Sequence, residues 1–252
     1  MMLTTASGAK RAPHADHAEA GALLRRWLSG AVGGDAFSWL QQEIGRQQAG
    51  DERRLAVALG LAGRKVGRHA LLLTADDIAG AQRVREGWQP QYWTTDEAAR
   101  AALLLASYRG DDQAFTARLD QLCVTAELAE HVSYMKALAI FPAAGSLRMR
   151  AREGVRSSIA PLFEAIACHN PYPRDLFDVH AWNQMIVKCV FGGTPLATVI
   201  GLKERRNNDL IEMLRDLVAE RHAAGRCLPG EVHEFIAGTD SQRATKAYRS
   251  DP

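Results

Sequence analysis

The stretch TTDEAARAALLLASY, residues 94–108, decides the fold class. It opens with Thr94 and Thr95, and either side chain can cap the start of a helix. Asp96 and Glu97 follow in the first turn, where acidic groups complement the helix dipole. The body of the stretch is alanine and leucine, the strongest helix formers. These features together predict an α-helix.

The rest of the sequence is also rich in residues that favour helices and poor in residues that favour strands. It contains 42 alanines and 27 leucines among 252 residues, and runs of β-branched residues are nearly absent. No Asn-Gly or Asp-Gly pair lies between alternating apolar segments, so the usual signal for a β-hairpin is missing. The sequence therefore predicts an all-α fold.

Short capped turns separate the predicted helices. Asp35, Asp51, Thr74 and the Gly110–Asp112 junction each mark a helix start, and further helices are expected over about 16–28, 128–140, 159–168 and 175–191. The apolar segments 101–106 and 137–141 begin 36 residues apart, close to the period of two-helix repeats. This spacing favours an armadillo/HEAT-like stack, and an irregular helical bundle is the alternative.

The distribution of polar residues predicts one domain with two tails. Residues 1–15 are small and polar without periodicity, and residues 238–252 are similar. We therefore expect a disordered N-terminal tail, a single helical domain over 16–237 and a flexible C-terminal tail.

Composition excludes several classes of protein. A formal net charge of +2 gives no reason to expect a nucleic-acid interface. Four well-separated cysteines argue against a disulfide scaffold or zinc ribbon and fit a reducing compartment. No apolar run approaches the roughly 18 residues that span a bilayer, and the first residues do not resemble a secretory signal. We therefore expect a soluble cytoplasmic protein.

The most unusual residues lie between 155 and 226. HNPYP, residues 169–173, contains two prolines that should end the preceding helix and hold an extended loop. The next predicted helix, DLFDVHAWNQMIVKCVF, has apolar residues on most of its surface and should be buried nearly all round, with Trp182 in the core. A polar stripe of His180, Gln184 and Lys188 would then need buried partners.

These strings resemble the EboA family of bacterial metabolite-traffic proteins. The resemblance rests on HNPYP, AWNQMIVKCVF, GLKERRNNDLIEML and ERHAAGR, and it is clearest over about 159–226. Cys189 and the pair Arg206-Asn207 depart from the residues expected there. The resemblance implies a gene cluster that also encodes a sugar-phosphate cyclase-like enzyme, a membrane prenyltransferase, an isomerase-like protein and metal-dependent hydrolases. It assigns no reaction to this chain.

Several polar residues are candidates for a site. His169 or His180 can act as a general acid or base, and the candidate ligand-binding residues are Asn170, Tyr172, Asn183, Gln184, Lys188 and Arg205. Each also has a structural interpretation, such as helix termination, ring packing or bonding to loop carbonyls. Cys168 is expected to be a buried structural thiol. No convincing set of metal ligands and no cofactor motif is found.

The favoured function is an accessory component of a metabolite pathway that binds a small polar metabolite or a partner enzyme. The alternatives are an enzyme acting on a sugar- or cyclitol-like compound, and a pure interaction scaffold. At least two of His169, Asn170, His180 and Asn183 are expected to line one polar cavity. The oligomeric state is not predicted.

Overall fold

The computed structural model describes residues 15–238, so nearly all of both predicted tails lies outside the described residues. Within this range 71% of the residues are helical and no strand is found. One isolated antiparallel bridge joins Ala70 to Thr94. The all-α prediction is confirmed.

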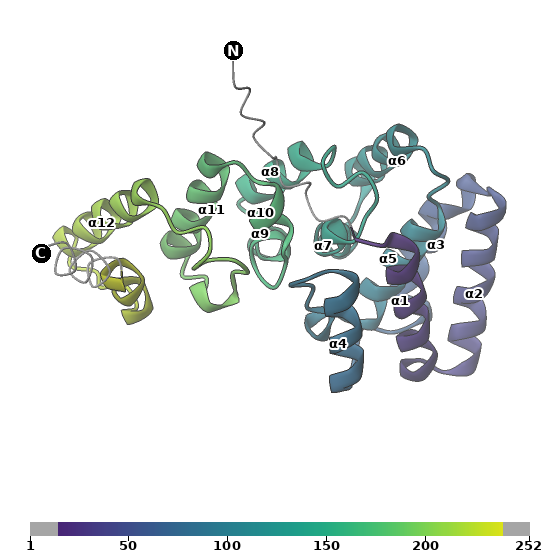
Figure 1. Cartoon of the computed structure of the whole chain (residues 1–252). Helices are drawn as coiled ribbons and strands as arrows, with labels where there is room; N and C mark the ends of the chain where they lie inside the picture. Colours follow the sequence, from purple (N-terminus) through teal and green to yellow (C-terminus); the bar gives the residue numbers. More distant parts are fainter. Residues whose placement is uncertain (1–14, 239–252) are drawn as a thin grey trace, which may run out of the picture.

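The helices follow one another through short connections (Figure 1). The first group comprises α1 (His17–Ala31), α2 (Gly34–Ala49), α3 (Glu52–Lys65), α4 (Ala75–Val84), the 3₁₀ turn η1 (Pro90–Tyr92), α5 (Thr95–Ala106), α6 (Asp112–Thr125) and α7 (Leu128–Lys136). The second comprises η2 (Ala137–Ala139), α8 (Arg148–Arg156), α9 (Ala160–Ala167), α10 (Tyr172–Leu176), α11 (Val179–Gly192), η3 (Leu196–Thr198) and α12 (Asn208–Ala223). A further helical segment covers 230–238.

Helix α5, the element predicted from residues 94–108, is the centre of the first group. Thr94 is its N-cap, and the backbone N–H of Thr94 donates a hydrogen bond to Glu97 Oε2 at 2.8 Å. Nearly every residue of α5 is buried, since α1, α2, α3 and α7 all pack against it. The small alanine side chains permit this close approach on several sides.

The second group extends away from this centre (Figure 1). α7 packs on α9, α9 on α8, and α11 on α12. The succession α1, α5, α7, α9 is compatible with a stack of helices, whereas the convergence of four helices on α5 is typical of a bundle. The armadillo/HEAT-like repeat therefore stays a prediction.

The structure corrects the interpretation of residues 169–191. The prolines do not hold an extended loop: Pro171 is the N-cap of the short helix α10 and Pro173 lies in its first turn, where a missing N–H costs nothing. The predicted helix 175–191 is also broken, because Phe177 and Asp178 separate α10 from α11. Asp178 caps α11 by accepting a hydrogen bond from the N–H of Ala181 at 2.7 Å.

Helix α11 is not buried nearly all round. Val179 and Phe191 are 52% and 63% exposed, and His180 and Gln184 are exposed as well. Trp182, by contrast, is completely buried, as predicted. No described helix covers the apolar residues on the outer side of α11. The prediction from the distribution of apolar residues therefore overestimated the burial of this helix.

Candidate functional site

The HNPYP segment borders a cavity of about 440 Å³. Its walls come from η1, α7, α9 and the segment 194–198, and we call it the His169 cavity. The polar and aromatic groups that line it include Tyr92, Lys136, Glu164, Cys168, Thr194 and Thr198. The volume lies within the range of small-molecule sites.

His169 is held in an unusual backbone conformation at the edge of this cavity. Its φ of +54° lies in the left-handed region, which non-glycine residues seldom adopt. The backbone N–H of His169 donates to the carbonyl of Thr198 at 2.8 Å. The imidazole stacks on the ring of Tyr92 with centroids 3.6 Å apart, and its Nδ1 lies 2.7 Å from Gln89 Oε1. Three contacts therefore fix both the backbone and the ring.

The environment of His169 favours the neutral imidazole. Burial lowers the pKa of His169, and the nearby Lys136 ammonium lowers it further. Because the Gln89 amide oxygen can only accept a hydrogen bond, Nδ1 carries the proton. The lone pair on Nε2 is then left as a hydrogen-bond acceptor.

The other polar groups of the cavity differ in how far neighbouring residues already satisfy their hydrogen bonds and charges. Lys136 Nζ donates to Glu97 Oε2 at 2.8 Å and to the carbonyl of Tyr92 at 3.1 Å, so its charge is balanced. Burial raises the pKa of the Cys168 thiol, which is therefore protonated and not an activated nucleophile. The hydroxyls of Thr194 and Thr198 supply neutral hydrogen-bonding groups.

Asn170 and Tyr172 hold the turn in place. The Asn170 amide nitrogen donates to the carbonyls of Met135 and Ala165 at 3.1 and 3.0 Å, and its oxygen accepts from the N–H of Tyr172 at 3.0 Å. The buried Tyr172 hydroxyl donates to the carbonyl of Ala144. Asn170 reaches the wall of the cavity, but its amide is already engaged.

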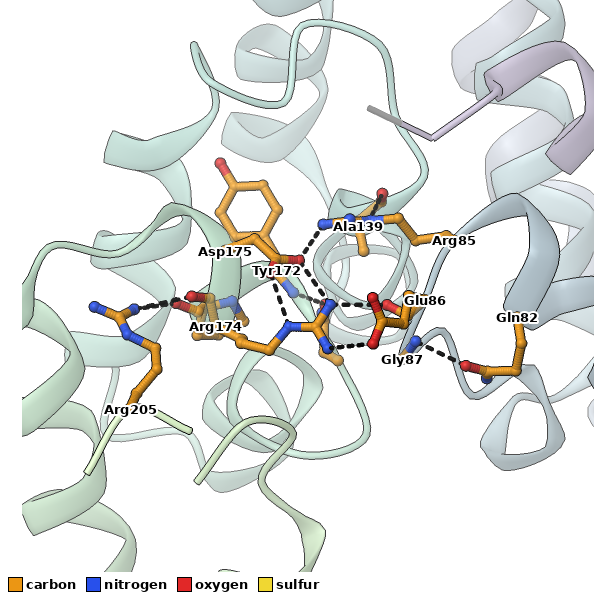
Figure 2. Close-up of polar contacts among 11 residues, drawn as sticks. Gln82, Arg85, Glu86, Gly87, Ala139, Tyr172, Arg174, Asp175 and Arg205 are labelled. Carbon is orange, nitrogen blue, oxygen red and sulfur yellow. Dashed lines mark hydrogen bonds and ion pairs between the residues drawn. The ribbon is translucent and has the colours of Figure 1, made fainter. Parts of the chain in front are cut away.

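A cluster of buried charges fixes the other side of the same turn (Figure 2). Asp175 pairs with Arg85, which follows α4, and with Arg174 Nε at 2.7 Å. Arg174 also donates to the carbonyl of Glu86 at 3.0 Å. These bonds connect the end of α4 to α10 across about ninety residues of sequence. Sequence reasoning missed this cluster, because the separation of its members leaves no local pattern.

Arg205 belongs to the same structural region. Its guanidinium donates to the carbonyls of Pro173 and Arg174 at 2.8 and 3.1 Å (Figure 2). It also lies over the Trp182 ring, 4.8 Å from the ring centroid. This guanidinium is therefore occupied by the end of α10 and by an aromatic face.

The remaining candidates on α11 lie elsewhere. Asn183 exchanges two amide hydrogen bonds with Asn207, the N-cap of α12, at 3.0 and 2.9 Å. Lys188 Nζ donates to the carbonyls of Val155 and Ser157 at the end of α8. His180 and Gln184 border a separate hollow next to α8. Of the four residues expected to share a cavity, the structure brings together only His169 and Asn170.

Most residues of the His169 site were not singled out from the sequence as site residues. Among them are Gln89, Tyr92, Lys136, Glu164, Thr194 and Thr198. The aromatic-rich turn at residues 88–93 was the available signal for the first two. Among the described residues, no group of three or more metal-ligating side chains occurs. No helix in the described range is long and apolar enough to cross a membrane.

Comparisons with known proteins agree with the motifs. The family described as metabolite traffic protein EboA matches residues 20–237, which is most of the chain. No curated protein and no solved structure matches the sequence. The match extends well upstream of HNPYP and includes the central helix α5. The chain therefore belongs to the EboA family of metabolite traffic proteins.

Proposed function

We propose that this protein binds a small, hydroxyl-bearing polar metabolite in the His169 cavity, as a non-catalytic accessory component of a metabolite pathway. The family description supports a role in metabolite traffic. A cavity of about 440 Å³ supports a ligand of the size of a sugar or cyclitol rather than a peptide. The four unpaired cysteines support a cytoplasmic location.

The observation that carries the proposal is the fixed orientation of His169. Left-handed backbone at a non-glycine residue costs about 1–2 kcal/mol, and such conformations concentrate at ligand sites. The stacked Tyr92 ring and the Gln89 amide hold the imidazole rigidly at the cavity wall. A rigid acceptor nitrogen binds a ligand hydroxyl without a large cost in side-chain entropy.

The chemistry of the other walls suits a neutral ligand with several hydroxyls. Aromatic and proline side chains offer flat apolar faces, and the Thr194 hydroxyl can donate or accept a hydrogen bond. The Thr198 hydroxyl donates to the carbonyl of Pro195 at 2.7 Å and can still accept a bond from a ligand. Lys136 is already paired with Glu97, so it does not present a free positive charge to an anion. The exposed Glu164 carboxylate can accept a bond from a further hydroxyl.

The second candidate function is an enzyme in which His169 is a general base. The neutral imidazole with an acceptor at Nε2 is the protonation state that a base requires. This interpretation predicts that a bound sugar or cyclitol is chemically changed, whereas the accessory role predicts that it is released intact.

The test is calorimetric titration of the full chain with myo-inositol and with D-glucose, followed by mass spectrometry of the recovered ligand. His169→Asn removes the imidazole while keeping a residue that tolerates left-handed backbone. His222→Asn, on the exposed surface of α12, is the matched control.

We expect binding to the wild type and the control, and binding at least about tenfold weaker in His169→Asn, the factor for one lost hydrogen bond of about 1.4 kcal/mol. A chemically altered ligand would support the enzyme instead. Equal binding by wild type and His169→Asn, or no binding by either, would contradict the proposal and leave a pure interaction scaffold as the better interpretation.

A further inference from the structure

Helix α8 carries four arginines in nine residues, and they divide between two faces. Arg150 is engaged on one face by Asp120 and Glu153, at 2.7 and 3.0 Å. Arg148, Arg152 and Arg156 are spaced four residues apart and therefore follow one line along the other face. This second face is free of the ion pairs that occupy Arg150.

The line of arginines faces a depression bounded by α10 and α11. One hollow of about 470 Å³ lies between 145–152 and 176–178, and one of about 180 Å³ lies between Arg152, Arg156 and the first turns of α11. Both hollows include Arg152 and Phe177, so they adjoin. We call the combined feature the Arg152 groove.

The groove combines excess positive charge with an apolar floor. Of these three arginines, Arg152 has a carboxylate partner among the described residues: its guanidinium lies 3.2 Å from an oxygen of Asp178. Arg148 and Arg156 are exposed, and the Nε of Arg148 donates to the carbonyl of Gly145 at 3.0 Å. Buried Phe177 lies beneath them, and His180 and Gln184 add hydrogen-bonding groups at one end.

We propose that the Arg152 groove binds a small molecule that carries a diphosphate group. Guanidinium groups present planar pairs of N–H donors that match phosphate oxygens. Side chains four residues apart on a helix are 5–6 Å apart at Cβ, so neighbouring arginines can converge on two linked phosphates. The concave shape suits a small ligand, and the exposed Met149 side chain at its wall offers an apolar surface to the organic part.

This site is separate from the one proposed for a hydroxyl-bearing metabolite. The His169 cavity and the Arg152 groove have no lining residue in common. His180 and Gln184, two of the polar candidates from the sequence, line this groove. Binding at either site can be measured without the other.

The test is calorimetric titration of the full chain with inorganic pyrophosphate and with ADP at low ionic strength, about 50 mM, where charge screening is weak. The decisive variant is Arg148→Gln combined with Arg156→Gln, since neither side chain forms a described ion pair that folding would lose. Arg53→Gln combined with Arg64→Gln, two exposed arginines of α3, is the control with the same change in net charge. Thermal melting verifies that both variants fold.

We expect saturable binding of one pyrophosphate per chain, about tenfold or more weaker in Arg148→Gln with Arg156→Gln and unchanged in Arg53→Gln with Arg64→Gln. Non-saturable binding that all the arginine variants weaken alike would overturn the proposal as general ionic attraction. Tighter binding of an octaglutamate peptide than of pyrophosphate or ADP would also overturn it, because it would identify the groove as a surface for an acidic protein segment.

Discussion

At the scale of single residues, His169 combines a costly backbone conformation with a ring that two neighbours, Tyr92 and Gln89, orient. The conformation itself follows from the junction between α9 and α10, where the N–H of His169 bonds to the carbonyl of Thr198. The stacked Tyr92 and the Gln89 amide then leave one imidazole nitrogen available. Geometry at this one residue distinguishes it from His180, which lies exposed on α11.

The pKa of His169 should be lower than the ordinary histidine value, because burial and Lys136 both disfavour the imidazolium. The unfolded chain takes up a proton near pH 6.5, whereas the folded chain resists it until lower pH. The contribution of His169 to the free energy of unfolding is therefore fully present above about pH 6.5, and it is lost as the pH falls through the pKa of the folded state. An NMR titration of the His169 ring measures the pKa directly.

Melting temperatures of wild type and His169→Asn at several values between about pH 7.5 and 5 provide the second readout. The melting temperature of His169→Asn should fall less than that of the wild type as the pH is lowered, whereas that of His222→Asn should fall as much as in the wild type. Parallel curves for the wild type and His169→Asn would contradict the prediction.

Trp182→Ala should lower the free energy of unfolding by about 3–5 kcal/mol, as for other large buried aromatic residues. Trp182 is 0% exposed and lies beneath the Arg205 guanidinium, so the substitution removes a packed ring and leaves a cavity. Trp182→Phe, which keeps most of the ring, should cost much less. Urea denaturation measures both, and an unchanged midpoint for Trp182→Ala would contradict the burial of this side chain.

At the scale of elements, α10 shows how a short helix is held by groups outside it. Five residues cannot form a stable helix alone. The Asn170 amide closes its start, Arg205 donates to the carbonyls of Pro173 and Arg174, and Asp175 pairs with Arg85. The position of the HNPYP segment therefore depends on contacts from α4, α7 and the segment before α12.

Asp175→Asn should destabilise the protein by about 3–5 kcal/mol, because Arg85 would keep its buried charge without a carboxylate and Arg174 would keep only Glu86, at 3.9 Å. Asp209→Asn, in the exposed first turn of α12, is the control and should cost less than about 1 kcal/mol. Chemical denaturation followed by circular dichroism measures the difference. Equal small effects of the two substitutions would show that the charge cluster does not hold α10.

At the scale of the whole molecule, one continuous core connects both groups of helices. Buried apolar residues form a single cluster from Ala20 in α1 to Val232 near the end of the described range. The central helix α5 packs against α7, and α7 packs against α9. This continuous core supports the prediction of a single helical domain over 16–237, which the next experiment tests.

Thermal unfolding should be a single cooperative transition in scanning calorimetry, because no break in the core separates two independent units. Leu59→Ala in α3 and Trp182→Ala in α11 should lower the same transition, each by several degrees. Two transitions that respond separately to the two substitutions would contradict a single domain and place a boundary between the two groups.

The sequence by itself determined the fold class and the starts of helices such as α4, α5 and α6. Helix propensity, caps such as Thr94 and Thr74, and glycine at helix ends act over a few residues, so they are readable along the chain. The burial of Trp182 and the family were also accessible in this way, since both rest on local strings of residues.

Tertiary structure alone decided which polar residues meet. The Arg85–Asp175 pair, the Gln89–His169 bond and the Asn183–Asn207 exchange join residues that are 90, 80 and 24 positions apart. The exposed outer side of α11 likewise depends on which helices reach it. These outcomes follow from how helices pack, and packing is a property of the whole chain that no local pattern encodes.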